Sequence, residues 1–469
     1  MFSDLKQFVP AEYCFQCQGC CVFDSTETPW RPFMAQEERL RSVFKNPEKG
    51  LDNTHVNPQG YINTVCEEGK GRCQVFDRQK FLCESYHVRP FECQIYPFMV
   101  VEKEGRPFLA AHLGCPYVHE HWRDEGFNEY VSYLIERMQK PAVKNFLFRN
   151  QGIVRPYEED DQFDFLYEFD LDHADVSDNI FSQRDDLTKT FKDMRCRLSA
   201  YAFPGLAVWD QIFSLDFHQV EGMACVFASD FIGSFLYYPP MGRGDIKSAV
   251  RAAFDILDRM NMSPGISRIE NVPEQSLDLF SEDYRCAYKT DEYVYRREDI
   301  AGLRGNAYKS KRSDYNHFVR YHAAEFLPYE EGMAEECLAL FDRWDQHKAE
   351  DAQEARMMLD DARASHRVMF RHYRDLGFTA RVVKVDGKIV AYTFGYPLTD
   401  TDFCVFAEIA DQSFKGLPSF IFREFCRDEV MRPFERVNVM DCFGLPQLEV
   451  TKQSFRPVEV LPVYTIYKN

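Results

Sequence analysis

The cysteines near the start of the sequence constrain what this chain can fold into more than any other feature. Nine of the sixteen cysteines lie within residues 1–115, and four of them form the run C-x-x-C-x-x-C-C over residues 14–21. Spacings of three place thiols on one side of a tight turn, where they can converge on one metal. Reduced structural thiols are the alternative. The candidate metal ligands are Cys14, Cys17, Cys20, Cys21, Cys73, Cys83 and Cys93.

The metal and the compartment follow from the same cysteines and their context. The first ten residues show no basic region followed by an apolar one, and no run of about eighteen apolar residues exists. We therefore expect a cytoplasmic chain with reduced thiols and no transmembrane segment. Thiolates suit zinc or an iron–sulfur cluster. Seven candidates exceed the four ligands of one zinc ion, which favours a [4Fe–4S] cluster and leaves zinc open. Cys66 and Cys115 are further candidates.

The charge of the chain excludes one broad class of function and leaves one local exception. With 56 basic and 75 acidic residues, the net charge of −19 excludes a generally basic nucleic-acid coat. Residues 303–320 are locally basic and carry interleaved aromatic residues. Such a run favours binding of phosphates or of an RNA end, and a solvated helix face is the alternative. The candidate substrate-binding residues of this run are Arg304, Lys309, Lys311 and Arg312.

Hydrophobic periodicity predicts the order of elements after the cysteines. Asp386-Gly387 between two apolar alternations predicts a hairpin. The last third of the chain reads strand, strand, strand, helix, strand and final strand, which is the order of a GNAT-type acyltransferase. The predicted helices are 122–138, 246–260, 334–347 and 417–431. The predicted strands are 223–229, 234–240, 266–273, 284–295, 378–385, 388–398, 402–410, 437–441 and 457–468.

These elements predict an α+β chain, in which a small cysteine-rich metal-binding domain precedes two tandem GNAT-like mixed α/β units. Residues 151–180 hold ten acidic side chains and one basic one, which predicts a solvated connector. The predicted parts are a cysteine domain (1–120), a helix and acidic linker (121–180), a first GNAT-like unit (181–298) and a second, transferase unit (299–469).

Two further segments carry candidate site residues of the transferase unit. A CoA-dependent enzyme needs a glycine-rich loop before the helix at 417, and the sequence there lacks most of that pattern. Gly416 remains as a position where the backbone can approach a ligand closely. In the tail, Asp441 ends a predicted strand, and Lys452 and Ser454 precede the last one. A carboxylate and a lysine can orient an amine and polarise a carbonyl. We predict that Asp441 and Lys452 are catalytic and that Lys452→Ala abolishes transfer while the fold stays intact.

The cysteine motifs resemble a known family over about residues 10–118. The run C-x-x-C-x-x-C-C is followed by G-x-C and then by C-x-x-Y-x-x-R-P-x-x-C-x-x-Y-P. This set is similar to the CxxCxxCC family of zinc- or iron-chelating domains, which includes a part of flagellin lysine N-methylases. The Arg89-Pro90 dipeptide is extended and aims Cys93 at the cluster, and Arg89 can offset the charge of several thiolates.

The later part of the chain, about residues 170–469, resembles the C-terminal domain of phosphatidylglycerol lysyltransferases. The matching stretches are 199–209, 288–318 and the tail pattern D…G-L-P-x-L-x-x-x-K-x-S-F-x-P, in which Glu449 replaces an expected basic residue. The resemblance implies tandem GNAT-like units. It also implies transfer of an aminoacyl group from aminoacyl-tRNA, or another activated acyl donor, to an amine or hydroxyl of a lipid, peptide or protein.

Three functional hypotheses follow from the sequence. The first is a tRNA-dependent aminoacyltransferase with an attached iron–sulfur or zinc domain. The second is a metal-binding protein whose GNAT half binds a ligand without turnover, a reading that the degenerate loop and Glu449 favour. The third is an acyltransferase that modifies proteins, by analogy with the methylase that shares the cysteine domain.

Overall fold

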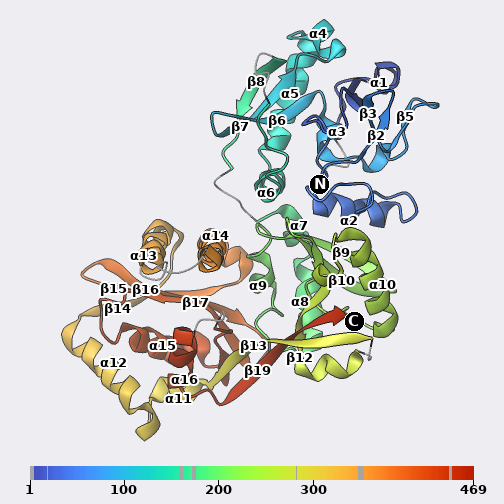
Figure 1. Ribbon diagram of the computed structural model, residues 1–469. Coiled ribbons are helices and arrows are strands. Elements are labelled where there is room, and N and C mark those ends of the chain that lie inside the picture. The colour runs from blue at the N-terminus through green and yellow to red at the C-terminus, as the bar shows by residue number, and fades with distance from the viewer. Residues whose placement is uncertain are drawn as a thin grey trace. The chain divides into compact units, whose positions relative to one another are not determined.

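The fold groups into two compact units, each made of separate chain segments (Figure 1). The computed structural model describes residues 5–17, 19–157, 162–171, 176–280, 283–346, 353–442 and 446–469. The first unit comprises residues 1–178 and 212–268, and the second comprises 179–211 and 269–467. The sequence predicts domain boundaries at residues 120, 180 and 298. The two compact units mix segments from different parts of the chain, so these boundaries stay predictions.

The cysteine-rich part of the first unit consists of short elements joined by turns. Its small sheet has the order β1-β3-β2, and β4 pairs with β5. The elements are α1 (Ala11–Cys17), β1 (Val22–Phe23), α2 (Gln36–Lys45), β2 (Thr64–Glu67), β3 (Lys70–Cys73), β4 (Phe76–Asp77), β5 (Leu82–Cys83) and α3 (Phe91–Ile95).

A second sheet, in the order β6-β7-β8, forms the main core of this segment with the helices that follow it. The predicted helix at 122–138 is α5, which begins at Glu125 because Asp124 caps it by accepting a hydrogen bond from the Phe127 N–H. Part of the predicted acidic connector is β8, which pairs with β7. The elements are β6 (Phe98–Lys103), β7 (Arg106–His112), α4 (Pro116–His121), α5 (Glu125–Met138), α6 (Pro141–Arg149) and β8 (Phe163–Glu168).

The other segment of the first unit confirms three sequence predictions. The strands β10 (Met223–Ser229) and β11 (Ser234–Leu236) pair in antiparallel fashion, and β9 (Ser214–Val220) pairs with β10 on its other side. Helix α10 (Ile246–Met260) has the predicted bounds and buries its predicted apolar face. Asp245 caps this helix by accepting hydrogen bonds from two backbone N–H groups.

Helix α2 joins these two segments through buried polar side chains. The Gln36 Nε2 donates to the Ser234 hydroxyl at 3.1 Å and to the Asn261 Oδ1 at 3.2 Å. The Arg41 guanidinium pairs with Asp216 at 2.6 Å. Because both segments supply these partners, α2 forms a polar seam between the cysteine-rich segment and residues 212–268.

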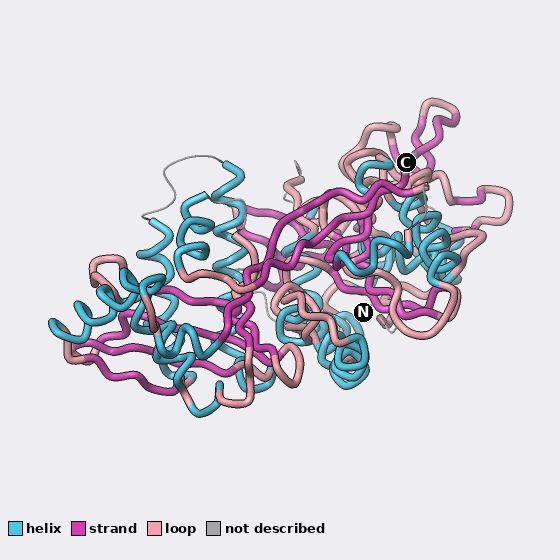
Figure 2. The backbone as a smooth tube through the Cα atoms, turned by 90° about the horizontal axis from the view of Figure 1, so that it is seen from below, coloured by secondary structure: helices cyan, strands magenta, loops and turns pink. Residues whose placement is uncertain are grey.

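The sheet of the second unit runs in the order β14-β15-β16-β17-β18-β13-β19-β12. Its strands are β12 (Arg268–Pro273), β13 (Tyr284–Arg296), β14 (Ala324–Pro328), β15 (Thr379–Val385), β16 (Lys388–Pro397), β17 (Asp402–Ala410), β18 (Arg436–Asn438) and β19 (Glu459–Lys468). In Figure 2 the C-terminal strand lies beside a second long strand, as the pairing of β19 with β13 requires.

Helices cover both faces of the β14–β17 part of this sheet. Figure 1 shows α13 and α14 on one face and α12 and α15 on the other. The helices of this unit are α7 (Asp178–Ser182), α8 (Arg184–Met194), α9 (Phe203–Ala207), α11 (Arg297–Gly302), α12 (Lys309–Tyr321), α13 (Ala334–Gln346), α14 (Gln353–Leu376), α15 (Leu417–Arg427) and α16 (Pro446–Ser454).

The predicted hairpin and the GNAT-like strand order are confirmed. Asp386 and Gly387 both have positive φ, 52° and 75°, as a tight two-residue hairpin turn requires. The strands β14 to β17 are antiparallel, α15 follows, and β18 then pairs in parallel with β17. The predicted α+β fold class is therefore correct. In the described ranges, every helix is too short or too polar to serve as a membrane span.

Candidate functional site

The seven candidate cysteines come from five short elements of the first unit. Helix α1 carries Cys14 and Cys17, and a 3-10 turn carries Cys20 and Cys21. Cys73, Cys83 and Cys93 lie in β3, β5 and α3, respectively.

Electrostatic interactions show that most of these thiols are neighbours. The Cys20 and Cys21 thiols share a hydrogen bond, which lowers the pKa of Cys20. Burial raises the pKa of Cys93 well above its usual value, and the charges of Cys73, Cys83 and Cys20 raise it further. Burial also raises the pKa of Cys73 to about 12. The sequence motifs therefore converge in space, as the spacing predicted.

Of the two further candidates, only one belongs to this group. Cys115 is buried, and its charge raises the pKa of Cys14, as does that of Cys20. Cys66 is exposed on β2. We therefore add Cys115 to the neighbourhood of the predicted set.

A cavity of about 320 Å³ lies against this thiol cluster, and we call it the cysteine cavity. Six of the seven candidates line it, and Cys17 is exposed elsewhere. Arg89 also lines the cavity, and its guanidinium lies 4.0 Å from the centre of the Tyr86 ring. Burial raises the pKa of Cys14, Cys83 and Cys93, and the positive charge of Arg89 opposes that rise. The hydrogen bond from Cys21 lowers the pKa of Cys20, and Arg89 adds to that effect, so Arg89 acts on thiols from four elements.

The cysteine thiols around the cavity have the chemistry of metal ligands, but they are not arranged around one metal position. Several thiols beside one cation are the soft, negatively charged ligands that zinc or an iron–sulfur cluster takes. Across the described residues, no three His, Cys, Asp or Glu side chains converge closely enough to hold a metal ion. The thiols line the cavity wall rather than point at one shared position.

Helix α2 also holds the start of α3, the helix that carries Cys93. The Glu38 carboxyl is buried and accepts hydrogen bonds from the Phe91 N–H at 2.6 Å and the Ala35 N–H at 3.0 Å. Burial raises the pKa of Glu38 to about 8. The buried Glu92 pairs with Arg155 at 2.9 Å. Phe91 and Glu92, which precede Cys93 in α3, are therefore fixed independently of the thiols.

In the second unit, the predicted catalytic pair lies at one half-buried turn after β18. The Lys452 Nζ donates to the carbonyl oxygens of Val439 at 2.7 Å, Met440 at 3.2 Å and Asp441. Burial lowers the pKa of Lys452 to about 8, and the Asp441 charge opposes that change. An ammonium group has three N–H donors, and here all three meet backbone carbonyls. We call residues 438–442 together with Lys452 the Lys452 turn.

The backbone of the Lys452 turn adopts an uncommon conformation. Met440 has φ of 61°, in the left-handed region that non-glycine residues rarely adopt. The Asn438 Oδ1 accepts a hydrogen bond from the Met440 N–H at 2.7 Å, while Lys452 holds the Met440 carbonyl. Because both sides of Met440 are held, Asp441 leaves the strand in a fixed direction.

A buried carboxylate connects this turn to two other sequence motifs. Glu292 of β13 accepts hydrogen bonds from the Asn438 Nδ2 at 2.6 Å, the Ser199 N–H at 2.8 Å and the Ser199 hydroxyl at 2.5 Å. Burial raises the pKa of Glu292. The three stretches on which the family resemblance rests, 199–209, 288–318 and the tail, therefore meet at one carboxylate. Sequence analysis did not single out Glu292 or Asn438.

Two further side chains lie at the Lys452 turn. The Tyr293 hydroxyl lies 3.8 Å from the Cys442 sulfur, and burial raises the pKa of Tyr293 to about 12. The Tyr295 hydroxyl donates to the Lys452 carbonyl at 2.8 Å. Ser454, a predicted binding residue, donates to the Thr451 carbonyl at 2.5 Å within α16.

The basic residues of the 303–320 run divide into two groups. Arg304 and Lys309 are exposed. Lys311 is half-buried, and its Nζ lies 4.0 Å from the centre of the Phe455 ring. Arg312 donates to the carbonyls of Leu303 and Gly305. Lys311 and Arg312 therefore already stabilise the fold locally.

Gly416 has a packing role in this structure. It precedes α15 with φ of 89°, and a Cβ there would overlap the Asp314 carbonyl oxygen of α12. Glycine is thus needed for the close approach of α15 to α12. A ligand role for Gly416 stays a prediction from the sequence.

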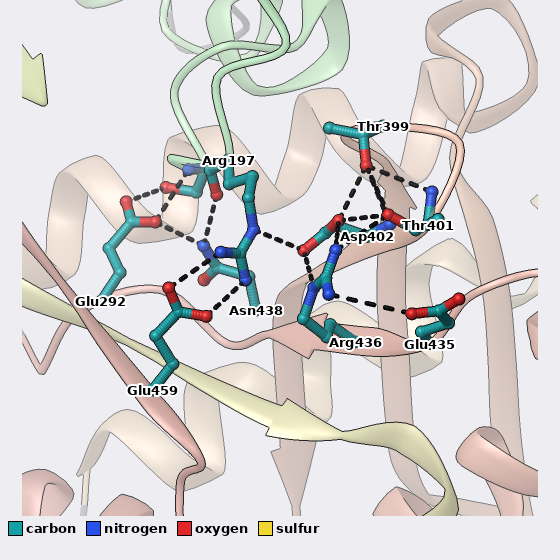
Figure 3. Close-up of polar contacts among 10 residues, drawn as sticks. Arg197, Glu292, Thr399, Thr401, Asp402, Glu435, Arg436, Asn438 and Glu459 are labelled. Atoms are coloured by element: carbon teal, nitrogen blue, oxygen red, sulfur yellow. Dashed lines mark hydrogen bonds and ion pairs between the residues drawn. The ribbon is translucent and has the colours of Figure 1, made fainter. Parts of the chain in front are cut away.

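An ion-pair network that sequence analysis missed fixes the start of β17 and β18 (Figure 3). Arg197 donates to both oxygens of Glu459 at 2.9 and 2.8 Å and to Asp402 at 2.7 Å. Arg436 donates to Asp402 at 2.8 and 2.9 Å. The hydrogen bonds that Asp402 receives hold its pKa well below its usual value despite burial. The partners lie up to 262 residues apart, so no local motif signals them.

Comparison with known proteins agrees with both parts of this description. Residues 191–467 match the family described as "Phosphatidylglycerol lysyltransferase, C-terminal". Residues 13–116 match the family described as "Putative zinc- or iron-chelating domain", with the CxxCxxCC signature. Among proteins with curated descriptions, none matches the chain.

One solved structure supports the fold of the C-terminal part, and a second one is less similar. A conserved protein of unknown function from Bacteroides thetaiotaomicron is 24% identical with a TM-score of 0.55, and the match covers 62% of this chain and 97% of that one. The L-PGS structure from Bacillus licheniformis is 16% identical with a TM-score of 0.42, covering 61% of this chain and 91% of that one. The first of these likenesses concerns the fold alone.

Proposed function

The chain belongs to the phosphatidylglycerol lysyltransferase C-terminal family, and on that basis we propose that it transfers an aminoacyl group from aminoacyl-tRNA to an amine or hydroxyl acceptor. The observation that carries the proposal is the Lys452 turn, where three motif stretches meet at Glu292 and present Asp441. An aminoacyl ester is already activated. The protein therefore has to orient the acceptor and stabilise the developing oxyanion.

In this reaction Asp441 orients the acceptor group and takes up its proton. Lys452 interacts electrostatically with this carboxylate and supplies positive charge beside the reacting carbonyl. Its three N–H groups are engaged by the turn, so its contribution is electrostatic and positional. The acceptor attacks the ester carbonyl, the ester C–O bond breaks, and the tRNA leaves with its terminal hydroxyl restored.

The test is an assay with the full chain and radiolabelled lysyl- or alanyl-tRNA. Phosphatidylglycerol vesicles, a lysine-containing peptide and a mixture of soluble proteins are offered as separate acceptors. We expect label to move to one acceptor class and Asp441→Asn to slow transfer at least a hundredfold. The matched control Asp400→Asn changes an exposed carboxylate and leaves the rate unchanged. Equal rates for the two variants would refute the role of Asp441.

The donor is proposed to bind along the exposed basic residues at the start of α12. Arg304 and Lys309 are exposed, whereas Lys311 and Arg312 make contacts within the protein. The binding constant K falls with salt, and the slope of log K against log salt is negative. Removing two contacts to a single-stranded tRNA end makes this slope shallower by about 1.4. We expect this change for the variant Arg304→Gln/Lys309→Gln in a filter-binding assay. An unchanged slope would place the donor elsewhere.

We also propose that the cysteine cavity holds a metal, either a [4Fe–4S] cluster or zinc, with ligands drawn from the seven predicted cysteines. The thiolates would hold the metal and Arg89 would offset their charge. A cluster would supply one-electron chemistry, whereas zinc would supply a structural crosslink. The test is iron, zinc and labile sulfide per chain in protein purified without oxygen, for Cys93→Ser and for the control Cys286→Ser. Metal that is lost equally in both variants, or in neither, would contradict this site.

Two other functions remain distinct outcomes of the same assays. The degenerate loop around Gly416 and the exposed Glu449 favour a non-catalytic ligand-binding protein. Tight binding of charged tRNA without transfer to any acceptor would establish that function. Label found only on soluble proteins would establish a protein-modifying acyltransferase. Because charged tRNA would be the donor for an aminoacyltransferase and for a protein-modifying acyltransferase, we also propose that the protein acts in the cytoplasm.

A further inference from the structure

Strand β17 contains a bulge that redirects the side chains after it. Phe394 pairs with Ala407 and Gly395 pairs with Val405, so Phe406 has no opposite partner on β16. A Cβ at position 395 would overlap the Cys404 carbonyl, which explains the glycine beside the bulge. A bulge of one residue reverses the alternation of side chains along a strand. Glu408 thereby faces the same side of the sheet as Val405.

On that side, Glu408 meets residues that pack under α15. Its charge raises the pKa values of Cys426, on α15, and of Tyr295, on β13, to which burial contributes most. Both residues belong to one hydrophobic cluster, which also includes Val405. The Tyr295 hydroxyl donates to the Lys452 carbonyl. Tyr295 therefore lies between Glu408 and the Lys452 turn.

Glu408 lies where two neighbouring strands have separated. Strands β17 and β18 pair only between residues 402–404 and 436–438 among the residues that the structure describes. The ion-pair network of Asp402 holds them together at that end. Glu408 comes four residues after the last paired position, on the edge of β17 that β18 no longer covers.

One oxygen of the Glu408 carboxyl group has no hydrogen-bond partner. Its Oε2 is buried and makes no hydrogen bond, and the Thr393 hydroxyl directly opposite on β16 is also buried without one. Within the described ranges, no cationic side chain forms an ion pair with Glu408. Burial raises the pKa of Glu408 to about 8, and Thr393 opposes that rise. A buried acceptor without a donor is costly unless a ligand supplies one.

We propose that Glu408, with Thr393 beside it, binds the α-ammonium group of the aminoacyl donor. The inference rests on the proposed aminoacyl transfer and names the part of the donor that this subsite recognises. An ammonium group supplies both the positive charge and the N–H donor that the buried Glu408 Oε2 lacks. The link through Tyr295 places this subsite next to the turn that presents Asp441.

Ligand binding at this subsite is coupled to a proton. Without ligand the Glu408 carboxyl carries a proton at pH 7, because its pKa is about 8. An ammonium group favours the carboxylate and therefore expels that proton. Binding at pH 7 thus releases close to one proton per chain. Neither the Lys452 turn nor the basic run of α12 requires such a release.

The test uses aminoacyl amides as soluble probes of the full chain in calorimetry. Alaninamide and lysinamide retain the α-ammonium group, and N-acetylalaninamide lacks it. We expect the two amides to bind at least tenfold more tightly than the acetylated probe. We also expect a heat that varies with the ionisation enthalpy of the buffer, as proton release requires. Glu408→Gln loses both effects, and the surface control Glu429→Gln keeps them.

Several outcomes overturn the inference, and they differ from failure of the proposed function. Equal affinity of Glu408→Gln and the native chain, or an equal proton release, refutes the subsite. So does a native chain that binds none of the amides. If charged tRNA still supports transfer in those cases, the proposed function stands without this subsite. Amide binding that needs Glu408, in a chain that transfers nothing, keeps the subsite and removes the function. Thermal unfolding confirms that Glu408→Gln folds.

Discussion

The Lys452 turn and the cysteine cavity both bury polar groups, but they satisfy them in opposite ways. At the Lys452 turn, every N–H of the ammonium group meets a carbonyl, and the Asn438 amide holds the other side of Met440. In the cysteine cavity, burial raises the pKa of Cys73 to about 12 and that of Cys93 well above its usual value, and the thiols line an open volume of about 320 Å³. The first region satisfies its donors within the protein, whereas the second leaves a cavity beside its thiols.

The largest expected effect is that of removing the proposed metal, which should change the cysteine cavity and leave the Lys452 turn unchanged. Structural metal sites contribute on the order of 10 kcal/mol to folding. A chelator, or oxidative loss of a cluster, should increase amide hydrogen exchange in residues 14–21 and 73–93 by at least a hundredfold. Exchange in residues 436–455 should not change. A similar increase in both segments would show that the comparison is wrong.

The second effect is the loss of Lys452. The structure changes the expectation that Lys452→Ala leaves the fold intact, because three carbonyls of the turn lose their donor. We expect Lys452→Met to lower the free energy of unfolding by about 3 kcal/mol and transfer by more than a hundredfold. Urea unfolding and single-turnover rates measure the two losses. The exposed control Lys388→Met should change neither.

The third effect is the pH dependence that Lys452 imposes on stability. Its pKa is about 8 in the folded protein and 10.5 in the unfolded chain, so the folded state binds fewer protons between these pH values. Stability contributed by Lys452 therefore rises with pH from 8 to 10.5, by at most about 3 kcal/mol. The difference in unfolding free energy between the native chain and Lys452→Met should grow over this window. A constant difference would contradict the burial of the ammonium group.

The smallest effect concerns the left-handed residue of the turn. Met440→Gly keeps φ of 61° accessible, so we expect a change in unfolding free energy within about 1 kcal/mol and near-native transfer. Met440→Val adds a β-branched residue where positive φ is strained, and should cost about 2 kcal/mol. Thermal unfolding of the pair measures the difference. Equal stability of the two variants would show that the turn does not hold this conformation.

Local patterns predicted much of the fold. The bounds of α10 and the hairpin at Asp386–Gly387 followed from periodicity and turn chemistry. The strands β8 and β14 and the helix α14 were missed. The first of these lies within a stretch whose charges indicated a solvated connector. Propensity and charge act over a few residues, whereas the pairing of β8 with β7 is decided by the tertiary core.

The candidate sites show the same division between local and distant information. Cysteine spacing and the tail motif indicated the thiol cluster and the Asp441–Lys452 pair. The partners of Asp402 and Glu292 were not visible, because Arg197 and Ser199 lie 205 and 93 residues away from them. Glu408 was hidden for another reason. Its orientation depends on the bulge at Phe406, and a strand of regular alternation would place it on the opposite face.

The polar seam formed by α2 has a consequence for how this chain can evolve. Across the seam, Gln36 donates to Ser234 and Asn261, and Arg41 pairs with Asp216. A gene that lost the segment encoding α2 would leave the residues around β11 and α10 without their hydrogen-bond partners. We therefore expect compensating substitutions to appear in pairs across the seam. The cysteine-rich segment and residues 212–268 depend on each other for these hydrogen bonds.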